Sequence, residues 1–413
     1  MDYIIKGGNR LCGEIADYGA KNCALALLGA TVLTDEKITL TNCPSIVDVE
    51  NMLLLLSSMG KRITRQGDTV TVSGGLSTTC AQPTLANLLR GSALILGSTV
   101  ARYHQISLPL PGGCAIGARP MDIHLKGLEA LGVSVDNSVD KVVCCGVPRG
   151  ASYNLRFASV GATENLLCAC VLAKGKSVLS NCATEPEVTA LEELLVKMGA
   201  DVKGVGTSTV QVVGVDKLHG AEFQVIPDRI VAATYISAAV ATLGDVTVTN
   251  CNPQHMQAFL EVISPHVYVE HDSNAIRVVA QNVPNGYGKI VTAPYPLFPT
   301  DMQSLILSLA ACSNGCTQIC ERLFENRLKH NAEQLNKMGA RITVDNDVAT
   351  AQGSKLSGAS VVAHDLRGGA GLVVAALNAS GKSVVGGIEH VNRGYVNLAQ
   401  NLRLLGADIA VNS

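Results

Sequence analysis

The sequence predicts an α/β protein made of two similar domains, each built from three repeated units. Its 413 residues exceed one ordinary domain of about 150 residues and favour two or three domains. A short phrase recurs along the whole chain, and small apolar segments alternate with short stretches rich in Val, Ile and Thr. Apolar residues make up 47% and charged residues 16%, a composition typical of a compact protein rather than of a disordered chain or a coiled coil.

The recurring phrase consists of an amphipathic segment, then Met or Leu, Gly, two further residues, and Val or Ile. It occurs as SSMGKRI (57–63), EALGVSV (129–135), VKMGADV (196–202), NKMGARI (336–342) and RLLGADI (403–409), with a degenerate copy, EVISPHV (261–267). The copies lie roughly 70 residues apart, a period that divides the chain into six units.

Each copy predicts a helix that is followed directly by a strand. In the third copy, one apolar helix stripe with the spacing i, i+3, i+4 and i+7 is formed by Leu191, Leu194, Leu195 and Met198. Gly199 then fits the left-handed backbone position that ends a helix, and a strand follows it.

The other half of each unit is a small-residue apolar helix that leads into a short strand. Examples are CALALLGATVL before KITLTN, NLLCACVLA before KSVLSN, and VAATYISAAVATL before DVTVTN. These helices are apolar on most faces, so we expect them to be buried. Their starts carry polar or charged residues at regular intervals, namely Lys21, Arg90, Ser159, Asp228, Asp301 and Asp365.

The polar helix starts have two interpretations. Ordinary helix capping accounts well for Ser159, or for an Asp taken in isolation. It accounts badly for Lys21 and Arg90, because a cation at a helix start opposes the helix dipole unless an anion offsets it. Several helix starts that face one cleft would instead form an anion-binding site.

The domain boundary follows from the repeat. Three units precede Asp228, so we place the boundary there. The first strand, residues 2–6, comes before the first unit and is free to pair with the C-terminal half, which would make the connection between the domains double. We therefore predict one domain from residues 1–20 plus 229–413 and another from 21–228, with ligand in the cleft between them.

Charge and hydropathy exclude several functional classes. The 32 basic and 34 acidic residues give a net charge of −2 without a basic tail, which argues against nucleic-acid binding. No apolar stretch reaches the roughly 18 residues of a membrane span, and the start MDYIIKGGNR lacks the features of a secretory signal, so we expect a cytoplasmic protein. The 14 cysteines are then expected to be reduced, and Cys312, Cys316 and Cys320 lack the spacing of metal ligands, so we expect no metal.

The segment SLPLPGGCAIGARPMDIH (107–124) interrupts the second unit with a loop rich in Pro and Gly. It is long enough to act as a lid over a site. Gly112 and Gly117 have the spacing of a P-loop, but the Lys and the Ser or Thr that such a loop needs are missing. Cys114 lies among glycines near Arg119, so its thiol is a candidate proton donor or nucleophile, against the alternative of an inert loop cysteine.

Polar motifs in the C-terminal half add further candidates. Asp301, in APYPLFPTDMQ (293–303), follows Pro-Thr at a helix start and is either a cap or a general base. The motifs FENR (324–327), DLRGGAG (365–371) and NRGY (392–395) supply Glu325, Arg327, Asp365, Arg367 and Arg393. Single surface arginines are usually only solvated, but three of them at equivalent repeat positions favour the binding of phosphate or carboxylate.

Taken in order, the motifs of this chain resemble those of the UDP-N-acetylglucosamine 1-carboxyvinyltransferase family of enolpyruvyl transferases. The matching segments are GAKN (19–22), LLRGS (88–92), PGGCAIGARP (111–120), SVGATEN (159–165), EPE (185–187), PDR (227–229), FPTDMQ (298–303), FENR (324–327), DLR (365–367) and NRGY (392–395). They cover essentially the whole chain. The resemblance implies two similar domains of three βαβαββ-type units each, an inside-out α/β barrel, with the active site in the cleft between them.

The resemblance also implies a reaction. Phosphoenolpyruvate and UDP-N-acetylglucosamine would give the 3-O-enolpyruvyl sugar nucleotide and phosphate by addition and elimination, in the first committed step of peptidoglycan synthesis. No metal or organic cofactor takes part in this reaction. The expected partners are small-molecule substrates, not nucleic acid or a membrane, and the sequence names no protein partner.

Residue roles are implied position by position. Lys21 and Asn22 resemble contacts to phosphoenolpyruvate, with Arg119 and Arg393 around its phosphate and carboxylate. The contacts to the sugar nucleotide correspond to Arg90, Arg119, Pro120, Met121, Asp122, Ile123, Ser159, Val160, Asp301 and Leu323. Arg327 and Arg367 complete the set of candidate substrate-binding residues.

The implied mechanism needs both an acid and a base. Cys114 is the family's acid for C3 of phosphoenolpyruvate, can form a covalent thioether adduct with it, and is the residue that fosfomycin alkylates. Asp301 would take the proton of the sugar 3′-hydroxyl. Lys21, Arg119 and Arg393 would stabilise the charge of the departing phosphate.

Three positions depart from the commonest family pattern. Phe157, Val231 and Asn392 stand where Lys, Glu and Asp are frequent. These departures remove no core catalytic group. The interpretation that this chain is a less active second copy of the enzyme stays open. Two further alternatives stay open, a catalytically silent regulator that binds a sugar nucleotide, and the shikimate-pathway enolpyruvyl transferase, which lacks the Cys-bearing loop and has Ser where Asn22 stands.

Overall fold

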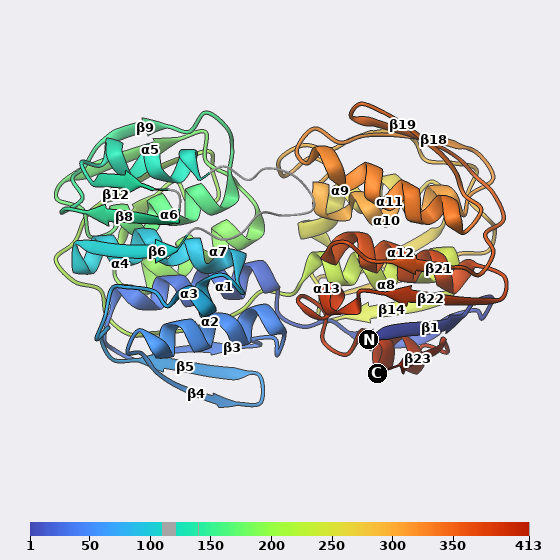
Figure 1. The fold of residues 1–413 in the computed structure, drawn as a ribbon, viewed down its shortest axis with the longest axis horizontal. Helices are drawn as coiled ribbons and strands as arrows, with labels where there is room; N and C mark the ends of the chain where they lie inside the picture. The colour runs from blue at the N-terminus through green and yellow to red at the C-terminus, as the bar shows by residue number, and fades with distance from the viewer. Residues whose placement is uncertain (110–120, 139, 413) are drawn as a thin grey trace. The chain divides into compact units, whose positions relative to one another are not determined.

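The computed structural model describes residues 1–109, 121–138 and 140–412 (Figure 1). Within these ranges, the side chains of Arg90 and Glu325 are not described. The described chain forms two compact units. The terminal unit, as we call it, contains the described residues from Met1 to Tyr18 and from Pro227 onward; the central unit contains the described residues between Gly19 and Ile226. The domain limits that the sequence predicts, 1–20 plus 229–413 and 21–228, concern parts of the chain that fold independently. They remain a prediction.

The central unit alternates helices with short strands. Its helices are α1 (Lys21–Ala30), α2 (Val47–Ser58), α3 (Pro83–Ala86), α4 (Ile95–Tyr103), α5 (Asp122–Ala130), α6 (Val160–Cys170) and α7 (Pro186–Lys197), with 3-10 turns η1 (Thr31–Leu33) and η2 (Arg90–Leu94). Its strands are β3 (Ile38–Thr41), β4 (Arg62–Gln66), β5 (Thr69–Ser73), β6 (Gln105–Pro109), β7 (Ser134–Asn137), β8 (Lys141–Cys145), β9 (Ser152–Asn154), β10 (Lys176–Ser180), β11 (Asp201–Lys203), β12 (Thr209–Val213) and β13 (Ala221–Gln224).

The terminal unit has the same alternation. Its helices are α8 (Arg229–Ala241), α9 (Gln257–Ile263), α10 (Gln303–Ala311), α11 (Glu325–Lys337), α12 (Leu366–Asn378), α13 (Ile388–Asn392) and α14 (Leu398–Leu404), with η3 (Pro253–Met256) and η4 (Thr300–Met302). Its strands are β1 (Asp2–Lys6), β2 (Cys12–Ala16), β14 (Asp245–Thr249), β15 (Tyr268–His271), β16 (Ala275–Val279), β17 (Gly288–Val291), β18 (Cys316–Cys320), β19 (Arg341–Asp345), β20 (Val348–Gln352), β21 (Ser360–Val362), β22 (Lys382–Gly386) and β23 (Asp408–Asn412).

The strands of the described residues form one small sheet for each repeat. The orders are β13-β3-β5-β4, β6-β8-β7 and β9-β10-β12-β11 in the central unit, and β2-β14-β16-β15, β17-β18-β20-β19 and β21-β22-β1-β23 in the terminal unit. In each four-stranded sheet the first two strands run parallel and the remaining neighbours run antiparallel. The α/β class and the three repeats per unit, which the sequence predicts, are confirmed.

Two strands exchange places between equivalent repeats. In the regular repeat a strand, a helix and a parallel strand follow one another, as in β9-α6-β10 and β17-α10-β18. By contrast, β2 leads into α1 but pairs with β14, which follows α8. In the same way β13 leads into α8 but pairs with β3, which follows α1. The chain therefore passes between the units twice, as the sequence predicts.

The first strand, β1, completes the last sheet of the chain. It lies between β22 and β23 and runs antiparallel to both, with Ile5 opposite Ser383 and Ile409. The predicted pairing of residues 2–6 with the C-terminal half is confirmed. The N-terminal strand takes the position that a strand of the local hairpin takes in the other sheets.

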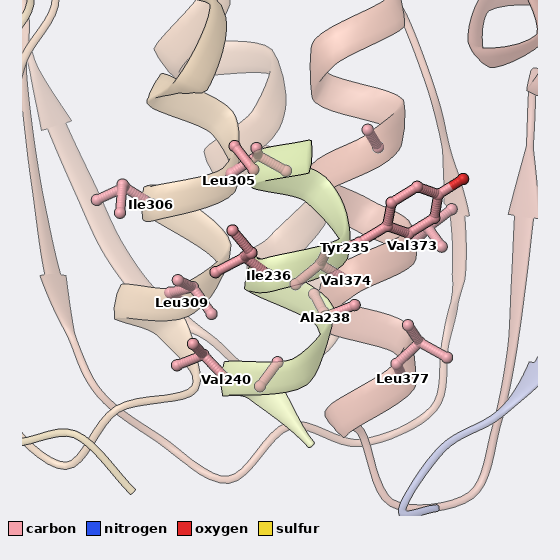
Figure 2. Packing of buried hydrophobic residues seen from close by; sticks show 14 of the residues in the cluster. Tyr235, Ile236, Ala238, Val240, Leu305, Ile306, Leu309, Val373, Val374 and Leu377 are labelled. Carbon is pink, nitrogen blue, oxygen red and sulfur yellow. The ribbon is translucent and has the colours of Figure 1, made fainter. Parts of the chain in front are cut away.

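The core of the terminal unit lies among three nearly all-apolar helices. Figure 2 shows Ile236 of α8, Leu305 and Leu309 of α10, and Val374 of α12 turned toward one another. A Cβ at Gly371 of α12 would lie 2.8 Å from the carbonyl oxygen of Ser304, so only glycine permits the close approach of α10 and α12. Helices this apolar need cover on every side, and the sheets around them supply it (Figure 1).

The glycines of the recurring phrase end their helices as predicted. Gly60, Gly132, Gly199, Gly339 and Gly406 all have a positive φ, between 80° and 118°. The left-handed conformation costs glycine little and other residues more, which explains the residue type. The degenerate copy differs, because Ser264 ends α9 with an ordinary right-handed backbone, φ −59° and ψ −27°.

Candidate functional site

Three of the six polar helix starts are ordinary caps. The side chain of Ser159 accepts a hydrogen bond from the N–H of Ala162 at the start of α6. Asp228 caps α8 and Asp365 caps α12 in the same way, with N–O distances of 2.9 and 3.0 Å. The capping interpretation is confirmed for these residues. The hydroxyl or carboxylate of each is already bonded to its own helix, which satisfies N–H groups that would otherwise be unpaired.

Asp301 has a different environment. It lies in η4, and the N-cap positions of η4 and α10 are Pro299 and Met302, neither of which caps with a side chain. The carboxylate instead accepts hydrogen bonds from two arginines, with Arg327 Nη1 3.2 Å from Oδ1 and Arg367 Nη2 3.3 Å from Oδ2. The side chains of both arginines are almost fully buried, whereas that of Asp301 is 25% exposed. The two guanidinium groups fix the orientation of the carboxylate, and part of the Asp301 side chain stays exposed.

Arg327 is held in place by the segment that precedes α10. Its Nη1 donates to the carbonyl and to the hydroxyl of Thr300, both at 2.8 Å. The Thr300 hydroxyl in turn donates to Glu321 Oε2 at 2.6 Å, and Glu321 Oε1 accepts from the N–H of Leu323 at 2.8 Å. Glu321 therefore connects the start of α11 to the loop that carries Asp301. The sequence analysis missed Glu321 and Thr300, although Glu321 stands three residues before FENR and Thr300 stands next to Asp301.

Arg367 lies in the first turn of α12, where the Asp365 cap sets its backbone. Burial by itself would lower the pKa of Arg367, but the charge of Asp301 and contacts to Tyr395 raise it, and the net direction is upward. Arg367 therefore stays cationic although it is buried. Tyr395, the last residue of NRGY, also contacts Thr234 of α8 through a 2.8 Å hydroxyl–hydroxyl hydrogen bond. Arg393, the third predicted arginine, is the half-buried C-cap residue of α13.

In the central unit, Lys21 is the first residue of α1 and is paired with a buried carboxylate. Its Nζ lies 3.2 Å from Oδ2 of Asp48, with 14% of the Lys21 side chain and 3% of the Asp48 side chain exposed. Asp48 belongs to the first turn of α2, where a negative charge is favourable. The Asp48 carboxylate is thus the anion that offsets the unfavourable interaction of Lys21 with the dipole of its helix, as the sequence predicts. The identity of that anion was missed, because Asp48 lies 27 residues away on another helix. Asn22 follows Lys21 on α1 and is half-buried.

The starts of α5 and α6 lie side by side in the central unit, since these helices pack on each other. Arg156, just before α6, bonds to Asp122 at the start of α5, with 2.9 Å between Nη2 and Oδ1. His124 of α5 and Asn165 of α6 share a 2.9 Å hydrogen bond. Burial lowers the pKa of His124 to about 4, against a smaller opposing effect of Asp122, so the imidazole is neutral. This pair of helix starts brings together five predicted residues: Met121, Asp122, Ile123, Ser159 and Val160.

The other predicted residues are distributed as follows. Asp301, Leu323, Arg327, Arg367 and Arg393 belong to the terminal unit, and Lys21, Asn22 and Arg90 belong to the central unit. Arg90 begins η2. The predicted lid residues Cys114, Arg119 and Pro120 lie outside the described residues.

The three positions that depart from the family pattern lie in different environments. Phe157 is 41% exposed, and its carbonyl accepts from the N–H of Ser159. Val231 is buried in the first turn of α8. The amide oxygen of Asn392 accepts a 3.3 Å hydrogen bond from the Tyr3 hydroxyl.

The described residues offer neither a metal site nor a membrane span. Among the described residues, no group of three or more His, Cys, Asp or Glu side chains is arranged to hold a metal ion. The described cysteines are all free thiols. No helix within the described ranges is both long enough and apolar enough to cross a membrane.

Comparisons with known proteins extend over the whole chain. A family model described as EPSP synthase (3-phosphoshikimate 1-carboxyvinyltransferase) matches residues 5–402. A UDP-N-acetylglucosamine 1-carboxyvinyltransferase from Endomicrobium trichonymphae is 44% identical, over 99% of this chain and 98% of that protein. The protein named UDP-N-acetylglucosamine 1-carboxyvinyltransferase 2 from Caldanaerobacter subterraneus subsp. tengcongensis is 41% identical, over 98% of each chain.

Solved structures share the fold. The enolpyruvyl transferase NikO from Streptomyces tendae superposes with a TM-score of 0.89 at 24% identity, over 99% of this chain and 98% of its own. An EPSP synthase from Acinetobacter baumannii gives a TM-score of 0.78 at 20% identity over the full length of both chains. At these identities the likeness concerns the fold, and it agrees with the two-unit architecture described above.

Proposed function

Because the chain belongs to the EPSP synthase family, we propose that it transfers the enolpyruvyl group of phosphoenolpyruvate to the 3′-hydroxyl of UDP-N-acetylglucosamine and releases phosphate. The names of relatives that are 41–44% identical over nearly their whole length support this choice of acceptor. The observation that carries the proposal is the Asp301 carboxylate, partly exposed and fixed by two buried arginines. Such an arrangement combines a proton acceptor with cationic groups for an anionic substrate.

The addition step makes a bond between the sugar oxygen and C2 of phosphoenolpyruvate. Protonation of C3 by the Cys114 thiol gives C2 the character of an oxocarbenium ion, which the sugar hydroxyl attacks. Asp301 takes the hydroxyl proton. Arg327 and Arg367 orient the Asp301 carboxylate, which accepts the proton as the new C–O bond makes that proton acidic.

The elimination step breaks the bond between C2 and the phosphate oxygen. A proton leaves C3 of the tetrahedral ketal, the enol ether forms again, and inorganic phosphate departs. Lys21, Arg119 and Arg393 stabilise the charge on the leaving phosphate. No oxidant, metal or organic cofactor is needed, because the atoms and electrons of the two substrates balance those of the two products.

Substrate binding is divided between two sets of residues. The set for phosphoenolpyruvate comprises Lys21, Asn22, Arg119 and Arg393, as the resemblance implies, and we propose that Arg327 and Arg367, whose substrate the sequence left unassigned, join this set. The set for the sugar nucleotide comprises Arg90, Arg119, Pro120, Met121, Asp122, Ile123, Ser159, Val160, Asp301 and Leu323. The close packing of the α5 and α6 starts supports a common role for the second set, since it places five of its members beside one another.

In the cell, this reaction is the first committed step of peptidoglycan biosynthesis. Loss of the enzyme would then affect cell shape and division, and the reaction would take place in the cytoplasm, where phosphoenolpyruvate and nucleotide sugars are made. The thiol of Cys114 would also form a thioether adduct with phosphoenolpyruvate and would be the target of fosfomycin.

The test is phosphate release from phosphoenolpyruvate with UDP-N-acetylglucosamine or with shikimate 3-phosphate as acceptor. We expect release with the sugar nucleotide only. Release with shikimate 3-phosphate only would assign the chain to the activity named in the family description. Release with neither acceptor would favour the silent regulator.

A separate test concerns Cys114. Mass spectrometry after treatment with fosfomycin is expected to find the label on Cys114 and on none of the other cysteines. Cys168, which is buried and has its pKa raised by burial and by Glu164, serves as an internal control. A label on another cysteine would contradict the role assigned to Cys114.

A further inference from the structure

Helix α11 carries a buried polar stripe. Arg327, Asn331 and Gln334 follow the spacing i, i+4 and i+7, and each is at most 5% exposed. They run alongside the apolar residues Leu328 and Leu335, which are also buried. Since α11 packs against α10 and α12, as Figure 1 also shows, the stripe faces protein and not solvent. Buried polar side chains on a helix need hydrogen-bond partners, so this stripe requires an explanation.

The two ends of the stripe are bonded to the segments that lead into the neighbouring helices. At one end Arg327 bonds to Thr300 and Asp301, just before α10. At the other end Gln334 Oε1 accepts from the N–H of Val362 at 3.1 Å, just before α12. The stripe therefore lies across the entries of α10 and α12, where Asp301 and Arg367 stand.

Asn331, in the middle of the stripe, has a polar side chain that no described protein atom satisfies. Both its Nδ2 and its Oδ1 are buried without a hydrogen-bond partner among the described residues. The same holds for Arg327 Nε and for Arg367 Nη1. Asn331 and Arg327 are one helical turn apart, which places their Cβ atoms about 6 Å from each other.

These unsatisfied groups comprise more donors than acceptors. The Asn331 Nδ2, Arg327 Nε and Arg367 Nη1 atoms all donate, and only the Asn331 Oδ1 accepts. They cannot satisfy one another, and each buried group left without a partner costs about 1–3 kcal/mol. An ordered water molecule both accepts and donates hydrogen bonds. Buried water therefore satisfies mixed sets of donors and acceptors inside proteins.

We propose that Asn331 is a positioning residue, which through ordered water holds Arg327 and Arg367 in the orientation that binds the carboxylate of phosphoenolpyruvate. This inference rests on the proposed function. Direct bonds fix one Nη atom of each arginine to Asp301. In this proposal, water bound to Asn331 holds the guanidinium of Arg327, one helical turn away, and through the shared Asp301 it also holds Arg367. The arginines then have the binding orientation already in the free enzyme. Less conformational entropy is therefore lost when the carboxylate binds.

The experiment compares three variants by steady-state kinetics with both substrates. Asn331→Leu keeps the branching of the side chain at Cγ and removes the polar atoms, and we expect the KM for phosphoenolpyruvate to rise about tenfold with little change in the KM for the acceptor. Asn331→Ser retains a hydroxyl and leaves room for one more water, so it is expected to restore most of the loss. The matched control is Asn378→Ala, which removes a hydrogen bond to Ala241 at the other end of α12 and should lower the Tm without changing either KM.

Equal KM values for phosphoenolpyruvate in Asn331→Leu and wild type would overturn the inference, and so would a change in both KM values together. If Asn331→Leu does not fold, the Asn331→Ser variant and a crystal structure of the wild type still decide. We expect water within hydrogen-bond distance of Asn331 and of an arginine; an Asn331 amide bonded only to protein would refute the inference. This structural result is independent of activity, and a wild type that releases no phosphate would overturn the proposed function alone.

Discussion

The terminal and central units place opposite charges at equivalent helix starts. In the terminal unit, the carboxylate of Asp301 lies between two buried arginines, Arg327 and Arg367. In the central unit, the ammonium group of Lys21 is paired with the buried carboxylate of Asp48. The repeat determines where each of these side chains stands on its helix. The oppositely charged partners come from other helices. These partners determine which charge is stable at a helix start and which chemical role the charged side chain can have.

Two acidic residues, one in each unit, show the same contrast. Asp301 has two guanidinium neighbours, whereas Glu192, on α7 of the central unit, accepts a 2.7 Å hydrogen bond from the N–H of Gly206. Burial raises the pKa of Glu192 to about 7, an effect that the hydrogen bond from Gly206 opposes and the nearby Glu193 increases. One carboxylate is therefore paired with two cations in the terminal unit, whereas burial drives another toward its neutral form in the central unit.

The largest effect is expected from Asp301→Asn, which removes the base and leaves two buried arginines facing a neutral amide. We expect kcat to fall by about 100- to 10,000-fold, the range for loss of a general base. Asp245→Asn is the matched control, because Asp245 also pairs with an arginine, Arg277, but at an exposed site. A fall in kcat of less than tenfold in Asp301→Asn would show that the arginine-bound carboxylate is not the base.

The second test concerns the pH dependence that Glu192 gives to folding. Because its pKa is raised in the folded state, its contribution to stability is fully present below the unfolded pKa of 4.5 and is lost as the pH rises through about 7. The free energy of unfolding of Glu192→Gln, relative to that of wild type, should therefore rise over this interval, by an amount on the order of 1–3 kcal/mol. Denaturant unfolding at several pH values measures it, and a difference that stays constant with pH would exclude the raised pKa.

A smaller effect is expected from Asp48→Asn, which weakens the ion pair that holds Lys21. The KM for phosphoenolpyruvate should rise about tenfold, equivalent to about 1.4 kcal/mol, while the KM for the acceptor stays close to that of wild type. Glu50→Gln is the control, since Glu50 lies on the same helix and pairs with Arg65. If both variants behave alike, Asp48 has no particular role in positioning Lys21.

The smallest effect tests the repeat itself. Gly132, in the central unit, has φ +80° and no neighbouring atom that an added Cβ would meet. Gly132→Ala should therefore cost about 1–2 kcal/mol of unfolding free energy from backbone strain alone. In the degenerate copy of the terminal unit, Ser264 has a right-handed backbone, and Ser264→Ala should change the stability by less than about 0.5 kcal/mol. Equal costs would mean that the backbone conformation at the helix end does not set the cost of the substitution.

The fold was largely predictable because its signals are local. The apolar stripe of Leu191, Leu194, Leu195 and Met198 and the glycine that follows it predict a helix end whatever the rest of the chain does. The exchange of β2 and β13 was not predictable. The alternation of apolar and polar residues in a strand indicates which face of the strand is buried, but it does not indicate which strand pairs with it.

The candidate site was predictable only in part. Spacing identified Asp301 and Lys21 but not their partners, because Asp48 and Arg367 reach them from distant helices. Glu321 gave only a weak signal, its place three residues before FENR, and Asn331 gave none, since the burial of both side chains arises only when the helices assemble. Ser159, Asp228 and Asp365 show the converse, because the repeat spacing identified them and each caps its own helix.

The central claim is that the Asp301 site serves enolpyruvyl transfer to a sugar nucleotide. Mass spectrometry of the acceptor, after incubation of the enzyme with phosphoenolpyruvate and UDP-N-acetylglucosamine, tests it most directly. We predict that the sugar nucleotide gains the mass of one enolpyruvyl group with wild type and with Asp245→Asn, and far more slowly with Asp301→Asn. An acceptor whose mass is unchanged by the wild-type enzyme, or a product formed equally fast by Asp301→Asn, would contradict the claim.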